Sequence, residues 1–300
     1  MIVLDTATSF INTLASAQRI HLTAYLLQRG KVLDALLAAA RRGAEVEVRL
    51  ERDPLDDPAG DLHRANADAL AKLQAAGASA EATKPGEPML HLKAAVVDGV
   101  AWLDDRNWAV AGAGRLVRDT DPADVAVVDS AVSGGPGADE HLATTKGGAQ
   151  QLEAALIERA GAGSLAVESE SFGNGAIYNA LLQRAEARLP TRLIVAGREA
   201  AQKSGGLERA HLQHLAALGV AVRLGNPKHG DLNEKLAVAD GSAWIGSTNA
   251  TYARGPAGEQ RDWGLTTQAR PVVDGLRAAF ERNWSAARPL ANLAGQAVVQ

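Results

Sequence analysis

HLKAAVVDGVAWLDDRN, residues 91–107, and NEKLAVADGSAWIGSTN, residues 233–249, are two copies of one motif. The copies lie 142 residues apart and are identical at eight of their seventeen positions. Each contains a Lys, an apolar run, an Asp-Gly pair, a Trp and a final Asn. Such a repeat indicates an internal duplication, which must be recognised before the fold is predicted.

The repeat extends beyond the motif, because the helical pattern of residues 207–219 aligns with the segment that ends at Gly77 at the same offset. Apolar runs typical of buried strands alternate with helical patterns, as in KVLDALLAAARRG (31–43) followed by AEVEVRLE (44–51). This order predicts sheets covered by helices. We therefore expect an α/β fold with two similar α/β/α sandwich halves, whose largely parallel central sheets are related by a pseudo-two-fold axis.

Gly and Pro concentrate between the two copies, in SGGPGADEHLATTKGG (133–148). Helical and strand periodicity disappear there, as is typical of a linker. We predict a first half over residues 1–132, a linker over 133–149 and a second half over 150–300. Two similar halves that pack face to face would bring both motif strands into one cleft.

The composition limits the function classes. The chain has 300 residues, of which 46% are hydrophobic and 22% charged, as expected for a soluble globular protein. Its net charge of -4 disfavours a surface for non-specific nucleic-acid binding. No apolar run reaches the roughly 18 residues of a transmembrane helix, and the first residues lack a signal-peptide pattern. We expect a cytoplasmic monomer. The absence of cysteine excludes disulfides, thiolate zinc sites and a cysteine nucleophile.

Both copies resemble the hallmark of the phospholipase D superfamily, which is H-x-K-x4-D followed by a Gly-Ser-x-Asn turn, once per half. The matching residues of the first copy are His91, Lys93, Asp98 and Asn107, with Asp104, Asp105 and Arg106 at the Gly-Ser-x positions. The matching residues of the second copy are Lys235, Asp240, Gly246, Ser247 and Asn249, with Asn233 at the position of the second His.

The resemblance also implies an acidic residue that opens the strand after each turn and orients a catalytic His. Asp124 in DVAVV and Asp262 in DWGL stand at these places in the sequence. The family fold is an α/β/α sandwich in each half, and the implied reaction is phosphodiester cleavage or transfer. The resemblance implies neither a metal nor another cofactor.

The residue types fit this chemistry. A phosphodiester is anionic and repels nucleophiles, so its non-bridging oxygens need nearby positive charge and hydrogen-bond donors. Lys93 and Lys235 would supply the charge, and Asn107 and Asn249 would supply amide donors. A neutral imidazole, with a pKa near 6.5, can then attack phosphorus and form a phosphohistidine. A carboxylate behind the ring fixes its tautomer.

Asn233 cannot serve as the general acid, since an amide has no accessible proton near neutral pH. General acid catalysis typically contributes 10²- to 10⁴-fold, so the substitution is severe for a poor leaving group. Three explanations compete. His229 reaches into the site as a substitute acid, the substrate carries a good leaving group, or the chain is a substrate-trapping variant or non-catalytic relative.

Simpler interpretations exist for several of these residues. A lone His-x-Lys triplet is usually an exposed strand edge, and it is the duplicated frame that favours a catalytic His91. Asp98 and Asp240 in Asp-Gly pairs are equally typical of turns, with a structural role. The sequence thus predicts a metal-independent phosphodiesterase or phosphatidyl transferase that acts through a phosphohistidine on His91.

The substrate is not fixed by these residues. A phospholipid is favoured, and the alternatives are a nuclease that acts on a nucleic-acid phosphodiester and a non-catalytic phosphate-binding relative. Substrate specificity would lie in the loops at residues 52–62, 111–123 and 253–261.

Overall fold

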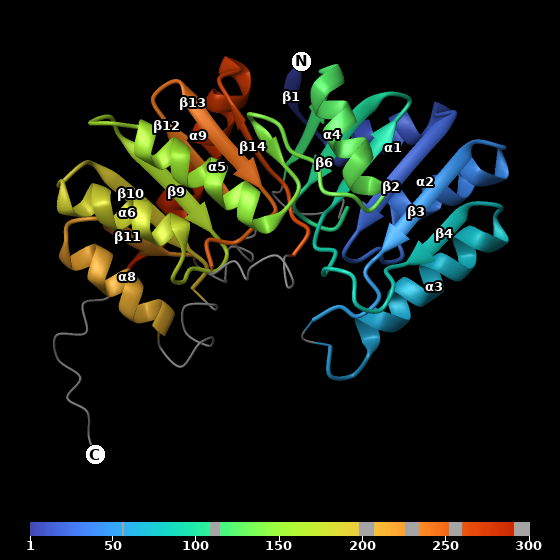
Figure 1. The fold of residues 1–300 in the computed structure, drawn as a ribbon, viewed down its shortest axis with the longest axis horizontal. Helices are drawn as coiled ribbons and strands as arrows, with labels where there is room; N and C mark the ends of the chain where they lie inside the picture. The colour runs from blue at the N-terminus through green and yellow to red at the C-terminus, as the bar shows by residue number, and fades with distance from the viewer. Residues whose placement is uncertain (56, 109–114, 198–206, 226–233, 252–259, 291–300) are drawn as a thin grey trace.

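The computed structural model describes residues 1–55, 57–108, 115–197, 207–225, 234–251 and 260–290. They form two α/β halves that lie side by side (Figure 1). The helices are α1 (Ala7–Ser16), α2 (Lys31–Arg41), α3 (Asp61–Ala75), α4 (Pro122–Val132), α5 (Lys146–Arg159), α6 (Ala176–Glu186), α8 (Leu207–Ala217) and α9 (Arg270–Ala286). Within the described parts of the chain, none of these helices is long and apolar enough to cross a membrane.

The first half contains a sheet of order β1-β7-β6-β5-β2-β3-β4. Its strands are β1 (Ile2–Asp5), β2 (Arg19–Ala24), β3 (Glu45–Leu50), β4 (Ser79–Ala82), β5 (Ala94–Val97), β6 (Val100–Asp104) and β7 (Leu116–Asp119). The second half contains a sheet of order β15-β11-β10-β9-β12-β13-β14-β8. Its strands are β8 (Leu142–Ala143), β9 (Leu165–Ser169), β10 (Thr191–Val195), β11 (Ala221–Leu224), β12 (Leu236–Ala239), β13 (Ser242–Gly246), β14 (Gly264–Thr267) and β15 (Arg288–Pro289).

Every strand of the first sheet has a counterpart in the second, which adds only β15 at its edge, and this confirms two similar α/β halves. The order β7-β6-β5-β2-β3-β4 matches β14-β13-β12-β9-β10-β11, and β1 lies beside β7 as β8 lies beside β14. The motif strands β5 and β12 hold the same central position in their own sheets. They do not belong to one continuous sheet.

The sheets are mixed, which corrects the expectation of largely parallel sheets. Parallel pairing is confined to β2-β3-β4 and β9-β10-β11. The motif strands instead form antiparallel hairpins, β5 with β6 and β12 with β13. The cause is local, since the two-residue Asp98-Gly99 turn has positive φ at both positions, 48° and 79°. Such Asp-Gly turns match the twist of an antiparallel hairpin.

Successive side chains of the motif strands point to opposite faces of each sheet, and the buried apolar residues form three clusters. Trp102 packs with Phe10 on the outer face of the first sheet, and Trp244 occupies the matching position in the second half. The opposite faces, with Leu103 and Ile245, join α4 and α9 in one shared cluster. Because this core belongs to both sheets, apolar burial holds the halves together.

The segment predicted as a linker, residues 133–149, contains regular structure at its end. β8 pairs with β14, and α5 begins at Lys146 after Thr145, whose hydroxyl accepts from the Gly148 amide. The preceding helix α4 packs on β5 and β6 of the first sheet. The chain therefore passes from one sheet to the other between β7 and β8.

Candidate active site

The centre of the candidate site is a contact between the two halves. His91 lies just before β5, and its Nδ1 is 2.7 Å from Oδ1 of Asp262, which lies just before β14. The backbones are joined as well, because the His91 amide donates to the Arg261 carbonyl at 2.9 Å. The Arg261 amide in turn donates to the Met89 carbonyl at 2.8 Å. The His–Asp pair is thus fixed by backbone and side-chain bonds.

Asp262 is held rigidly behind the ring. It is fully buried, and its Oδ1 also accepts a hydrogen bond from Ser247 Oγ at 2.8 Å. Ser247 Oγ accepts from the Trp263 amide at 3.0 Å, and Trp263 Nε1 donates to the Asp104 carbonyl at 2.8 Å. Burial raises the pKa of Asp262, but the combined effects of His91, Lys93 and the Ser247 hydrogen bond lower it below its usual value. The carboxyl is therefore ionised at neutral pH.

The electrostatics favour a neutral His91. Burial lowers the pKa of its imidazole below the usual 6.5, and the charge of Lys93 lowers it further, against the opposite effect of Asp262. With its Nδ1 proton directed to Asp262, the neutral ring carries a lone pair on Nε2. This is the protonation state that a nucleophilic imidazole requires.

Lys93 lies beside His91 and is buried. Its side chain is 1% exposed, and Nζ donates to the His91 carbonyl at 2.6 Å. Nζ also lies 5.5 Å from the centroid of the Tyr25 ring, which packs against the His91 ring at 5.1 Å. Burial lowers the pKa of Lys93 to about 8. Lys93 therefore carries its charge at neutral pH and loses it in mild alkali.

Lys235, the counterpart of Lys93, has a carboxylate partner. Its buried Nζ lies 3.0 Å from Glu170 Oε2, and Asn249 Nδ2 donates to the same oxygen at 3.4 Å. Burial raises the pKa of Glu170, but the combined effects of Lys235, the Asn249 hydrogen bond and the charge of His91 lower it below its usual value. An ionised carboxylate thus contacts two groups that the motif predicts as phosphate ligands.

Sequence reasoning missed Glu170. It follows β9, the strand that pairs with motif strand β12, just as Tyr25 follows β2, the strand that pairs with motif strand β5. Alignment of strand ends, rather than of the motif alone, would have placed Glu170 beside Lys235. The charges of Lys93 and Lys235 act on each other and on His91, so both lysines belong to one site.

Asn107 is half-buried, and the turn before it contains the buried carboxyls of Asp104 and Asp105. Asn107 follows β6 with φ of 56°, and its buried Oδ1 has no hydrogen-bond partner. Arg106 Nε lies 3.4 Å from Asp105 Oδ1. Burial, together with the charge of Asp104, raises the pKa of Asp105 to about 7, and the charge of Lys235 acts in the opposite direction. The first half therefore presents acids where the second half has Gly246 and Ser247.

Asp98 and Asp240 lie at the far ends of the hairpins, away from the lysines. Asp98 Oδ1 accepts from the amides of Gln18 and Arg19 at 3.1 and 2.8 Å, which ties the turn to the start of β2. Asp240 occupies the same turn position between β12 and β13. For Asp98 the structural interpretation of the Asp-Gly pair therefore accounts for its contacts.

Asp124 does not orient His91, and the prediction of a strand at DVAVV was wrong. Asp124 lies in α4, which begins because Asp121 caps the helix by accepting from the Ala123 amide and Pro122 occupies the first turn. Its carboxyl faces Asp119 and Asp139. Of the two predicted acids, it is Asp262 that contacts His91 in the described part of the chain.

Two predicted site residues lie outside the described part of the chain. These are Asn233, at the position of the second His, and His229, the candidate substitute acid. Of the predicted specificity loops, residues 52–55, 57–62, 115–123 and 260–261 are described. The prediction of a loop over 111–123 was wrong for residues 116–119, which form β7, and for residues 122–123, which begin α4.

Comparisons with known proteins agree with this geometry. Residues 10–113 match the family model described as cardiolipin synthase, PLD-like domain. The fold is similar to phosphatidylserine synthase from Haemophilus influenzae Rd KW20, with a TM-score of 0.68, 12% identity, and coverage of 96% of this chain and 87% of that chain.

The fold is also similar to polyphosphate kinase from Porphyromonas gingivalis, with a TM-score of 0.69 and 14% identity. The match covers 95% of this chain but only 50% of the kinase, so the chain spans half the length of that protein. No curated protein matches the chain by sequence. The family match is thus confined to residues 10–113, and the likeness to these two solved structures, at 12% and 14% identity, shows that the chain shares their fold.

Proposed function

We propose that the chain cleaves or transfers a phosphodiester through a covalent phosphohistidine on His91. The observation that supports this most directly is the 2.7 Å contact between His91 Nδ1 and Asp262 Oδ1. With Nδ1 occupied by a buried carboxylate, Nε2 is the nitrogen left for attack. The lowered pKa of His91 keeps that nitrogen unprotonated near neutral pH.

The reaction has two balanced steps. In the first, His91 Nε2 forms a bond to phosphorus, the bond from phosphorus to the leaving oxygen breaks, and that oxygen takes up a proton. In the second, water or an alcohol attacks phosphorus and loses a proton, and the phosphorus–nitrogen bond breaks to restore the imidazole. Lys93, Lys235, Asn107 and Asn249 would stabilise the charge on the non-bridging oxygens. No step in this sequence calls for a metal ion or an organic cofactor.

A phospholipid is the favoured substrate class. The family match in the first half refers to cardiolipin synthase, and the phosphatidylserine synthase likeness covers most of both chains. A nuclease remains the alternative within the same chemistry, and the net charge of -4 weighs against it. His91, Asp262 and both lysines come from one copy of the chain, so we propose that a monomer contains the whole site.

The test is turnover of three diesters as a function of pH: phospholipid in mixed micelles, single-stranded DNA and an activated aryl diester. We expect kcat/KM to rise with pH through a pKa below 6.5, as His91 becomes neutral. It should fall again through a pKa of about 8, as Lys93 loses its charge. Mass spectrometry of the quenched enzyme should show the phosphoryl adduct on the peptide that contains His91.

Each result has a distinct meaning. Preference for micellar phospholipid over DNA supports the phospholipid assignment, and the reverse preference supports the nuclease. Activity that needs a protonated group with a pKa below 6.5, or an adduct on another residue, contradicts the phosphohistidine mechanism. Failure to turn over even the aryl diester, which needs no proton for its leaving group, would support a protein that only binds phosphate.

The non-catalytic alternative rests on Glu170. Its carboxylate contacts Lys235 Nζ and Asn249 Nδ2, the two groups expected to hold phosphate oxygens in the second half. A substrate phosphate must displace this carboxylate or bind beside it. Since two anions repel each other at such a short distance, the ion pair competes with the substrate.

We predict that Glu170→Gln strengthens binding of phosphate or tungstate by about tenfold or more. The variant removes the competing carboxylate charge, and each 1.4 kcal/mol gained in binding free energy raises the affinity tenfold. Isothermal titration of wild type and variant provides the measurement. Glu140→Gln, at a Glu whose side chain is 86% exposed, is the matched control and should leave the affinity unchanged. Weaker binding by Glu170→Gln would mean that Glu170 holds Lys235 in place for the anion rather than competing with it.

A further inference from the structure

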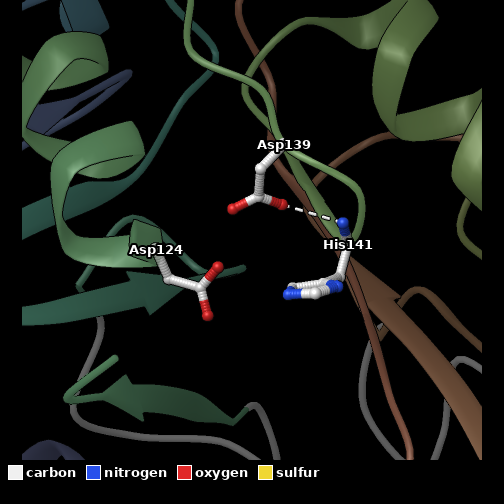
Figure 2. A group of neighbouring side chains, drawn as sticks. All are labelled: Asp124, Asp139 and His141. Atoms are coloured by element: carbon white, nitrogen blue, oxygen red, sulfur yellow. Dashed lines mark hydrogen bonds between the residues drawn. The ribbon is translucent and has the colours of Figure 1, made fainter. Parts of the chain in front are cut away.

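A second group of ionisable side chains lies where the chain passes between the halves, outside the His91 site. Asp124 comes from α4, and Asp139 and His141 come from the segment before β8 (Figure 2). One possible ligand atom from each residue lies within 4.8 Å of the others. These residues have no part in the phosphodiester chemistry.

Asp124 is the most buried residue of the group. It is only 2% exposed, and its Oδ1 is buried without a hydrogen-bond partner. Figure 2 shows its carboxylate directed toward Asp139 and His141. Asp139 Oδ2 is likewise buried without a partner. Unpaired buried carboxylate oxygens are costly, so two of them that face each other call for a positive ion or a proton between them.

The other oxygen of Asp139 is held in place by backbone amides. Asp139 Oδ1 accepts from the amides of His141 and Leu142, both at 2.8 Å. A third carboxylate, Asp119, accepts from the Asp121 amide at 2.8 Å through Oδ1, which is also 3.4 Å from the amino group of Met1. Its Oδ2 is buried without a partner. Fixed carboxylates with one free oxygen each resemble ligands supported by their surroundings.

We propose that Asp124, Asp139 and His141 form a site for a divalent transition-metal ion, Zn²⁺ or Mn²⁺, with Asp119 beside it. The donor set explains this choice, because one imidazole nitrogen combined with carboxylate oxygens suits these ions. Ca²⁺ and Mg²⁺ prefer oxygen ligands throughout.

The position of the group indicates a structural role for the ion. α4 packs on β5 and β6 of the first sheet, whereas the His141 carbonyl accepts from the Thr266 amide of β14 in the second sheet at 2.8 Å. An ion between Asp124 and His141 would therefore connect a helix of the first half to the first segment of the second. Its binding should stabilise the folded chain.

The experiment uses the full chain, stripped with chelator and titrated with Zn²⁺, Mn²⁺ or Ca²⁺. We expect one Zn²⁺ or Mn²⁺ per chain by elemental analysis after dialysis, a higher midpoint of thermal unfolding with either ion, and weaker binding of Ca²⁺. Asp124→Asn and His141→Ala should each lower the affinity by more than about 100-fold, beyond the usual effect of losing a supporting partner.

Asp129→Asn is the matched control, because it makes the same chemical change elsewhere on α4 and should leave metal binding unchanged. Because His141 is 41% exposed, His141→Ala is expected to fold, and it tests the proposal even if Asp124→Asn does not fold. Absence of saturable Zn²⁺ and Mn²⁺ binding, or equal affinity in wild type and His141→Ala, overturns the proposal. The proposal is also overturned if Asp124→Asn is more stable than wild type and its unfolding midpoint does not change with metal. In that case a shared proton, not a metal ion, holds the carboxyls together in the wild type.

Discussion

Replacing Asp262 with Asn is expected to lower kcat by about 10⁴-fold, the size seen when the acid that orients a catalytic His becomes an amide. Asp262 Oδ1 contacts His91 Nδ1 at 2.7 Å. An Asn amide group at that position would donate to Nδ1 instead of accepting from it. The ring would then carry its proton on Nε2, where it cannot attack phosphorus.

The measurement is kcat on the aryl diester, with the pH profile as a second readout. Loss of the Asp262 charge removes an effect that raises the pKa of His91, so the acid limb should shift to lower pH. His91→Ala should be inactive. Asp240→Asn, in an exposed hairpin turn, is the matched control and should retain activity.

Stability needs a separate check, because Asp262 is fully buried and also binds Ser247 Oγ. Ser247→Ala removes that bond while leaving the carboxylate in place, and should cost much less activity. If Asp262→Asn folds and keeps near-native kcat, the carboxylate does not set the tautomer of His91. The proposed nucleophile would then lose its main support.

The duplicated motif made the overall fold predictable. Trp102 and Trp244, together with the Asp-Gly turns, keep the same spacing because the hairpins that carry them pack in the same way in each half. His91 and both lysines were found for the same reason. The Asp98-Gly99 turn also encodes the antiparallel pairing locally, whereas the alternation of helices and strands along the chain favours parallel pairing.

The assignment of Asp124 failed because the spacing between halves changes after the motif. The offset is 142 at the ends of β6 and β13 but 148 at the starts of β7 and β14. By the larger offset the sequence counterpart of Asp262 is Gly114, not Asp124. The first half therefore has no acid at that place. The Asp121-Pro122 helix start was the local signal against a strand.

Glu170 and the Asp124 group could not be found from the motif, since their partners are distant in sequence. Glu170 meets Lys235 only because β9 and β12 are neighbours in the sheet. Asp124 meets His141 because α4 folds back toward the segment before β8. Such contacts depend on tertiary packing and therefore cannot be predicted from a short sequence pattern.

The first half has a carboxyl at a different place from the second half. In the first half, Asp105 stands at the position of Ser247, which in the second half binds the orienting Asp262. Asp105 is buried, and burial and Asp104 raise its pKa to about 7. A carboxyl is thus available in the first half even though Gly114 replaces the acid.

We therefore predict that Asn233→His raises turnover of an unactivated alkyl diester by roughly 10²-fold, the lower end of what general acid catalysis contributes. An aryl diester should gain much less, because its leaving group departs without a proton. The measured quantity is the ratio of alkyl to aryl rates in wild type and Asn233→His, near the pKa of imidazole.

Asn233→Gln, which adds size but no titratable group, is the matched control and should not change that ratio. If wild type already turns over both diesters and Asn233→His leaves the ratio unchanged, another group such as His229 donates the proton, and Asn233 is no defect in the site.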